Sequence, residues 1–108
     1  MSIRETHMSW NKLKEMKFPF TDYEEDEVPE GSWQGQLDQV CYPKGGAAGL
    51  HVFLTRTDTQ KKYHFFQHWL GGCEPHQTWK EASLGGLFEV TIGHSRNGRP
   101  KFLKVVAL

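Results

Sequence analysis

Residues 86–107 read GLFEVTIGHSRNGRPKFLKVVA, and this stretch decides the fold. Its first half alternates polar or small residues with Phe88, Val90 and Ile92, which is the period of a strand with one buried face. Asn97-Gly98 then separates this half from a second strand-like run. An Asn-Gly pair in that position predicts a β-hairpin, because a type I′ turn needs positive φ at both central residues.

Three further strand patterns precede the hairpin. They cover residues 33–42, 50–57 and 61–70, and glycine-rich or polar turns separate them. In the second pattern the apolar residues Leu50, Val52 and Leu54 share one face. His51 and Phe53 therefore belong to the opposite face of that strand. Pro100 cannot donate to a ladder, so we expect it at the start of the last strand or on an edge.

Residues 75–83 lack the two-residue period. Pro75 suits a first helical turn, and Gly85-Gly86 would end a short helix in which Trp79 fills the interior of the fold. The expected order is then strand, strand, strand, short helix, strand, strand. This order predicts a mostly β fold, a five-stranded OB-like barrel with one short helix between strands 3 and 4. Other small barrels and half-open sheets would give the same order.

The chain divides into two parts of different character. Residues 1–30 form an acidic N-terminal leader, and residues 31–108 form the OB-like β-barrel domain. We expect a short helix over residues 10–17 of the leader and a partly mobile acidic run over residues 22–27, whose like charges repel one another.

The net charge of zero hides an uneven distribution. Residues 1–30 hold four Lys or Arg against eight Asp or Glu, whereas residues 31–108 hold nine against five. An acidic leader on a basic body suggests an anion-binding surface with a segment that competes for it. Solvated surface charge without a function is the alternative explanation.

Catalytic and cofactor motifs are missing from the sequence. It has no phosphate-binding glycine loop followed by Lys and Ser or Thr, no GxSxG elbow and no paired carboxylates in the body. We therefore expect no enzyme and no cofactor. His68, Cys73 and His76 lie close together in the sequence, but these are only three ligands and a structural zinc site needs four. His64 or Cys41 would have to be brought near by the fold to supply the fourth. We expect no metal and a free buried thiol instead.

Aromatic and basic residues alternate along the body, as in proteins that bind single-stranded nucleic acid by stacking bases and neutralising phosphates. In an OB-fold, the loop after the first strand and the loop between the last two strands flank the binding face. Both loops carry cations here. The predicted nucleic-acid-binding residues are Lys44, His51, Phe53, Arg56, Lys61, Lys62, Tyr63, Phe66, Arg96, Arg99 and Lys101. The competing explanation is that strand aromatics are core and hairpin cations protect an edge.

Two stretches carry a family resemblance. Pro29-Glu30-Gly31-Ser32-Trp33 fits a P-x-G-x-Y/W start of the first strand, and residues 86–100 fit a late hairpin that closes a barrel. On these stretches the body resembles the small OB-fold single-stranded DNA-binding proteins of bacteriophages and other mobile elements. The resemblance implies non-catalytic, sequence-tolerant binding of single-stranded DNA in phage or mobile-element replication or recombination. Those proteins often end in an acidic tail, whereas here the acidic run lies on the N-terminal side.

A second function stays open from the sequence. The chain would then be a protein-binding inhibitor, an anti-host or anti-defence factor of a phage, and its acidic leader would mimic nucleic acid. Besides single-stranded DNA, a host or phage replication protein and a second copy of the chain remain open as partners. The apolar runs are shorter than a membrane helix, and no signal peptide is visible, so we expect no membrane partner and a cytoplasmic location.

Overall fold

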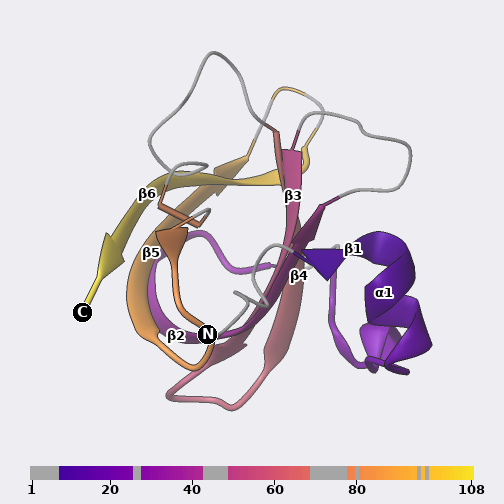
Figure 1. Ribbon diagram of the computed structural model, residues 1–108. Helices are drawn as coiled ribbons and strands as arrows, with labels where there is room; N and C mark the ends of the chain where they lie inside the picture. The colour runs from indigo at the N-terminus through magenta and orange to yellow at the C-terminus, as the bar shows by residue number, and fades with distance from the viewer. Residues whose placement is uncertain are drawn as a thin grey trace.

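The structure, a computed structural model, describes residues 8–25, 28–42, 49–68, 78–79, 81–94, 96 and 98–108. Five long strands form one antiparallel sheet in the order β4-β3-β2-β5-β6 (Figure 1). They are β2 (Gly31–Tyr42), β3 (Gly49–Arg56), β4 (Lys62–His68), β5 (Leu87–His94) and β6 (Pro100–Ala107). The first four have the spatial order of a Greek key, since β5 returns to lie beside β2. The five strands predicted from the sequence are thereby confirmed.

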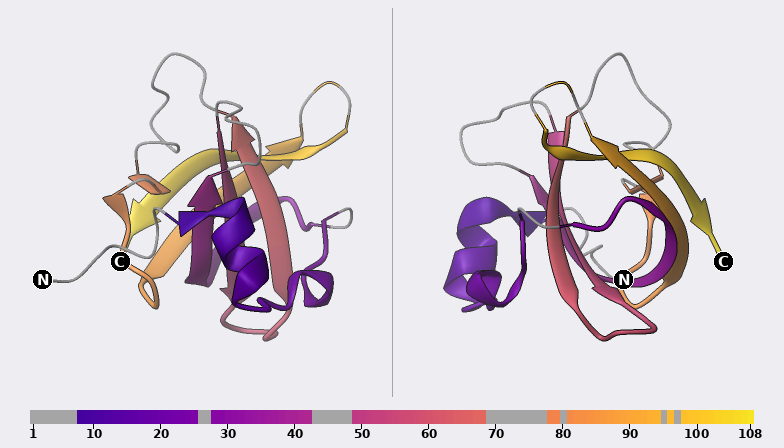
Figure 2. Two further views of the ribbon diagram at one scale, coloured as in Figure 1. Left: turned by 45° about the vertical axis from the view of Figure 1, so that its right-hand side comes forward. Right: turned by 180° about the vertical axis from the view of Figure 1, so that it is seen from behind.

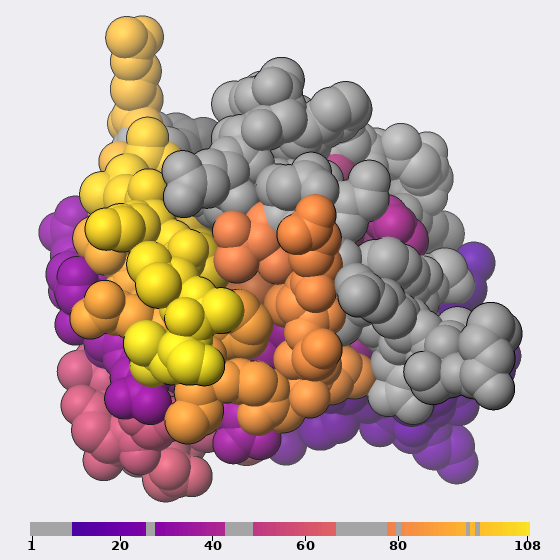
Figure 3. Space-filling model, turned by 60° about the vertical axis from the view of Figure 1, so that its left-hand side comes forward, coloured from indigo at the N-terminus to yellow at the C-terminus, as the bar shows by residue number. Residues whose placement is uncertain are grey.

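The predicted closed barrel is wrong, because no backbone ladder joins β4 to β6 among the described residues. The sheet curls until the two edge strands face each other (Figure 2). The rings of Phe65 and Phe102 fill the space between these strands, with centroids 4.4 Å apart. Side chains rather than hydrogen bonds therefore connect the edges. Strand β6 starts at Pro100, as expected for a residue without an N–H, and runs over the surface beside β5 (Figure 3).

The predicted position of the short helix is also wrong for the elements that the structure describes. Helix α1 (Trp10–Glu15) precedes β2, and a 3-10 turn, η2 (Phe20–Asp22), follows it. Helix α1 agrees with the helix expected in the leader, and Lys17 ends it with a left-handed φ of 58°. Between β4 and β5 only Thr78, Trp79 and Glu81 have helical backbone among the described residues, and these form no bounded helix.

A β-bulge in β2 decides which face each side chain of this strand occupies. Leu37 lies opposite Leu54 and Gln39 lies opposite Phe53, so Asp38 is an extra residue in β2. The bulge shifts the alternation by one residue. Leu37 and Val40 therefore both point to the inner face, and Gln39 and Cys41 occupy the outer face.

The inner face of the curled sheet encloses the main core. Trp79 is wholly buried there, as predicted, and its ring lies 4.9 Å from Phe88 and 5.1 Å from Phe102. All members of this inner core come from residue 28 onwards, and they are Val28, Trp33, Leu37, Val40, Leu50, Val52, Leu54, Tyr63, Phe65, Trp79, Ala82, Phe88, Val90, Ile92, Phe102 and Val105. Val28 is thus the one described residue of the leader, residues 1–30, that belongs to this inner core.

The N-terminal segment, residues 8–25, packs on the outer face of the sheet beside β3 and β4 (Figures 1 and 2). It begins with β1 (Met8–Ser9), which pairs in parallel with the end of β2 at Cys41 and Tyr42. Leu13 of α1 is wholly buried in this outer layer. Neither described helix is long and apolar enough to cross a membrane.

Replacing Leu54, which is wholly buried in the inner core, by alanine should lower the free energy of unfolding by about 2–5 kcal/mol. The matched control is Leu108→Ala, because Leu108 is 68 % exposed. That change should alter the stability by less than about 0.5 kcal/mol. Urea denaturation followed by circular dichroism measures both, and equal effects would contradict the placement of Leu54.

Candidate nucleic-acid interface

The outer face of β3 and β4 carries a continuous row of rings. Strand pairing places His64 opposite Phe53 and Phe66 opposite His51. The rings of Phe53 and His64 are stacked, with centroids 4.3 Å apart and planes 9° from parallel. His51 lies 5.1 Å from His64 and 5.0 Å from Phe66. We call these four residues the ring platform.

Two histidines of the ring platform bond to each other inside this layer. His51 Nδ1 and His64 Nε2 are 2.9 Å apart, so one ring donates an N–H to the other. The pKa of each histidine is lowered to about 4, mainly by burial, and the neighbouring His64 contributes to the shift of His51. The second nitrogen of His64, Nδ1, lies 3.2 Å from the exposed carboxylate of Glu25. Both histidines are therefore neutral at pH 7.

Aromatic side chains of the N-terminal segment cover the ring platform. Trp10 lies 4.4 Å from the ring of His51. Phe53 makes T-shaped contacts with Phe18, Tyr23 and Phe20, whose ring centroids lie 4.8, 5.1 and 5.9 Å from its own, and none of its surface is exposed. The covering rings also contact one another, since Phe18 stacks on Tyr23 and Trp10 lies against Phe20.

Polar contacts of Tyr23, together called the latch, attach the end of this covering segment to the sheet. The hydroxyl of Tyr23 donates to Asp38 Oδ2 at 2.9 Å, and the hydroxyl of Thr55 donates to the same oxygen at 2.5 Å. Burial and the hydrogen bond to Asp38 raise the pKa of Tyr23. Lys62 donates to Thr55 and holds its ammonium group 5.5 Å from the centroid of the Tyr23 ring. The bulge in β2 thus supplies the acceptor for this latch.

Backbone hydrogen bonds add a second attachment at the edge of β4. The N–H of Glu24 donates to the carbonyl of Lys62, and the N–H of His64 donates to the carbonyl of Glu24, each at 2.9 Å. Residue 24 therefore adds one bridge to the open edge strand, in parallel with Tyr63. The side chains of Asp22, Glu24 and Glu25 remain exposed on the outside of the cover.

The predicted site residues separate into distinct locations. His51, Phe53 and Phe66 come together in the ring platform, and Lys62 lies next to it. The other predicted aromatic, Tyr63, belongs to the inner core and is only 4 % exposed. In this conformation neither Tyr63 nor Phe53 is open to a base. Lys44 lies outside the described residues.

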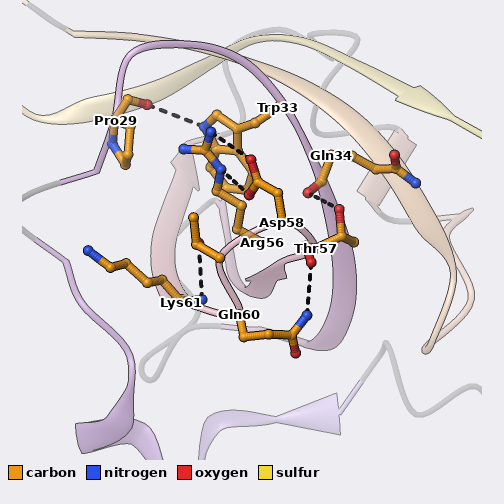
Figure 4. A network of polar contacts seen from close by, with 9 residues as sticks. Pro29, Trp33, Gln34, Arg56, Thr57, Asp58, Gln60 and Lys61 are labelled. Atoms are coloured by element: carbon orange, nitrogen blue, oxygen red, sulfur yellow. Dashed lines mark hydrogen bonds and ion pairs between the residues drawn. The ribbon is translucent and has the colours of Figure 1, made fainter.

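The predicted cations lie at two opposite ends of the sheet. Arg56, Lys61 and Lys62 surround the β3–β4 turn, whereas Arg96, Arg99 and Lys101 belong to the exposed β5–β6 hairpin (Figure 1). Arg56 is already engaged, since it forms two hydrogen bonds with Asp58 at 2.6 and 3.1 Å (Figure 4). This contact also lowers the pKa of Asp58.

The guanidinium of Arg56 lies 5.6 Å from the ring centroid of Trp33, whose indole N–H donates to the carbonyl of Pro29 (Figure 4). These contacts connect the β3–β4 turn to the start of β2. Arg56 therefore has a structural role at this end of the sheet.

Three parts of this arrangement were not predicted from the sequence: the place of His64 in the ring platform, the role of Asp38 as hydrogen-bond acceptor for Tyr23, and the packing of the leader aromatics over the platform. The signal for His64 was available, because it alternates with Tyr63 and Phe65 in the third strand and must lie on the outer face. No local signal identifies Asp38, since the bulge that exposes it to Tyr23 depends on the pairing of β2 with β3.

Metal ligands do not gather in the part of the chain that the structure describes, where no three His, Cys, Asp or Glu side chains could hold an ion. The predicted cluster around Cys73 and His76 lies outside that part. Cys41 is buried in the outer layer, and burial raises the pKa of its thiol to about 12, so it is protonated at neutral pH.

Comparison of the chain with protein-family models, with curated proteins and with solved structures gives no match in any of the three cases. The assignment of function therefore depends on the residues and their geometry.

Acid should weaken the fold through the histidine pair. The pKa of each histidine is 6.5 without the fold and about 4 within it, so the unfolded chain binds protons that the folded chain does not. The contribution of the pair to the free energy of unfolding should be fully present above pH 6.5 and should decline as the pH falls toward 4. The free energy of unfolding should then change by up to about 1.4 kcal/mol per pH unit for each histidine. Urea denaturation between these pH values measures this slope. The double variant His51→Gln/His64→Gln should have a flatter profile, and an identical profile would contradict the proposed cause.

Because the covering rings bury Phe53 completely, Phe53 should contribute strongly to the free energy of unfolding. Phe53→Ala should cost about 3–5 kcal/mol, because it removes a wholly buried ring from between the cover and the sheet. Phe66→Ala is the matched control, since Phe66 is only half-buried. Urea denaturation should show a smaller loss of the free energy of unfolding for Phe66→Ala than for Phe53→Ala. The reverse order would show that the outer layer is packed less tightly around Phe53 than around Phe66.

Proposed function

We propose that this protein binds single-stranded DNA without sequence preference, and that it does so on the outer face of β3 and β4. The ring platform carries this proposal. Phe53 and His64 stack on each other, His51 lies tilted beside His64 and at 60° to Phe66, and bases of any sequence can pack against the faces and edges of such a row of rings. A platform of this kind binds bases without a hydrogen-bond code, so it is sequence-tolerant.

The position of the ring platform supports the proposal. An OB-fold is a five-stranded, partly open Greek-key barrel that binds oligonucleotides on the face of its second and third strands. Here the curled sheet has a Greek-key order and open edges, and its second and third long strands are β3 and β4. The ring platform thus occupies the face that an OB-fold uses, in agreement with the resemblance to phage single-stranded DNA-binding proteins.

Cations at both ends of the sheet provide phosphate contacts in this proposal. Lys62 adjoins the ring platform, Lys61 is exposed in the neighbouring turn, and Arg99 and Lys101 are exposed on the β5–β6 hairpin. A strand that crosses the outer face would have bases on the rings and phosphates near these side chains. Arg56 is a weaker candidate, because Asp58 already compensates its charge.

One observation favours the second candidate function, a protein-binding inhibitor. The ring platform is covered, and the exposed surface of the cover carries the carboxylates of Asp22, Glu24 and Glu25. A protein with a basic groove would meet these acids first. In that case the chain would have no affinity for DNA, and its partner would contact the N-terminal segment.

Fluorescence polarisation with labelled poly-dT tests the proposal. Binding should weaken with salt, and Arg99→Ala and Lys101→Ala should each reduce the slope of log K against log salt by about 0.7, the value for one phosphate contact on a single strand. Both variants should act equally on poly-dT and on mixed sequences. Lys14→Ala, on the exposed side of α1, is the charge-matched control and should leave the slope unchanged.

The same titration can reject DNA binding. The variant Tyr23→Phe weakens the attachment of the N-terminal segment, because it removes the hydrogen bond to Asp38. If the full chain and this variant both lack measurable affinity for poly-dT at low salt, the ring platform is not a DNA site. The protein-binding function would then be the better proposal.

A further inference from the structure

We propose that residues 8–25 are a displaceable cover that occupies the base-stacking surface in the free protein. The aromatic side chains of the cover, not its acids, would be the main competitor of DNA. This inference rests on the proposed function, because it concerns the regulation of the same site. The ligand that displaces the cover is a single-stranded nucleic acid whose bases replace the rings of Trp10, Phe18, Phe20 and Tyr23.

The geometry of the cover supports competition by aromatic contacts. The ring centroids of Trp10 and His51 lie 4.4 Å apart with the planes tilted by 37°, and those of Phe18 and Phe53 lie 4.8 Å apart in a T-shaped contact. These rings fill the space above the ring platform, so that Phe53 is wholly buried. A base and the covering rings cannot occupy that space together. Binding of DNA to the ring platform therefore requires that the cover moves.

The separation of the two hydrophobic clusters allows this movement. The outer cluster consists of Leu13, Tyr23, Cys41 and Phe53 with Trp10, Phe18 and Phe20 against it. The inner core starts at Val28 and contains no described residue of the cover. The sheet would therefore keep its inner core when the cover leaves, and only the outer layer would be exchanged for ligand.

Besides its ring contacts, the cover is attached to the sheet by local polar contacts. These include the two-residue strand β1, the backbone bridge at Glu24, the hydrogen bond from Tyr23 to Asp38, the contact of the Lys62 ammonium with the Tyr23 ring and the contact between His64 and Glu25. Short attachments of this kind open with a lower free energy than a whole domain. The affinity for DNA would then be the intrinsic affinity of the ring platform multiplied by the fraction of molecules in which the cover is open.

Two changes should alter the open fraction in opposite directions, the substitution Tyr23→Phe by raising it and an engineered disulfide by lowering it. Tyr23→Phe keeps the ring but removes the hydroxyl that bonds to Asp38, so it should raise the open fraction. The loss of one hydrogen bond should increase the affinity for poly-dT by about two- to tenfold. Ser83→Ala, which removes an exposed hydroxyl outside the cover, is the control and should leave the affinity unchanged.

A disulfide can close the cover. Met8 and Cys41 are register partners in the parallel pair of β1 and β2. Neighbouring strands lie about 4.8 Å apart, within the Cα separation of about 4.4–6.8 Å that disulfides span. Met8→Cys, made with Cys73→Ser so that a single cysteine pair remains, should form this disulfide when it is refolded with an oxidant. The locked protein should lose at least about tenfold in affinity for poly-dT, and reduction should restore it.

Hydrogen exchange reports the position of the cover directly. The amide of His64 donates to the carbonyl of Glu24, so its protection depends on the cover. Saturating poly-dT should speed the exchange of this amide. The amide of Leu37, which donates to the carbonyl of Gly86 within the sheet, is the control and should stay protected. The same control verifies that the variants are folded.

The outcomes separate this inference from the proposed function. If the locked, reduced and Tyr23→Phe proteins bind poly-dT equally and the His64 amide stays protected, DNA binds elsewhere and the cover is a permanent part of the fold. If none of them binds poly-dT, the proposed function fails together with this inference. If Tyr23→Phe binds more tightly, the locked protein binds less tightly and the His64 amide loses protection, the inference holds.

Discussion

The arrangement of this protein depends on one irregularity, the bulge at Asp38 in the central strand β2. The bulge shifts the alternation of the strand, so Val40 joins the inner core while Gln39 and Cys41 face the outer layer. It also places the Asp38 carboxylate where the hydroxyls of Tyr23 and Thr55 both donate to it. One extra residue therefore connects the core of the sheet to the attachment of the N-terminal segment.

The sheet consequently has two apolar faces with different roles. The inner face closes on itself and includes Trp79 and the facing rings of Phe65 and Phe102. The outer face of β3 and β4 cannot close on itself, and the N-terminal segment covers it. An exposed row of aromatic rings would be an aggregation hazard. A cover from the same chain removes much of this aromatic surface from water.

Histidine pairing within the outer layer has a physical consequence of its own. His51 and His64 are buried next to each other and share one hydrogen bond, so the charged form of either ring is disfavoured. Neutral imidazoles are flat, weakly polar rings, which suits His64 to stack on Phe53 and His51 to pack against Trp10. The exposed carboxylate of Glu25 contacts the outer nitrogen of His64. The layer thus combines aromatic packing with a few specific polar contacts.

The sequence by itself determined the five strands, the hairpin around Gly98 and the opposite faces of Val52 and Phe53, because alternation and turn residues are local signals. It could not determine the open edges of the sheet, since these depend on how far β4 and β6 curl toward each other. The cover was equally hidden, because contacts between Trp10 and His51 join residues far apart in the chain. Only the tertiary structure decided that the rings predicted to meet a ligand meet the protein's own N-terminal segment, since burial of apolar surface favours whichever partner lies nearest.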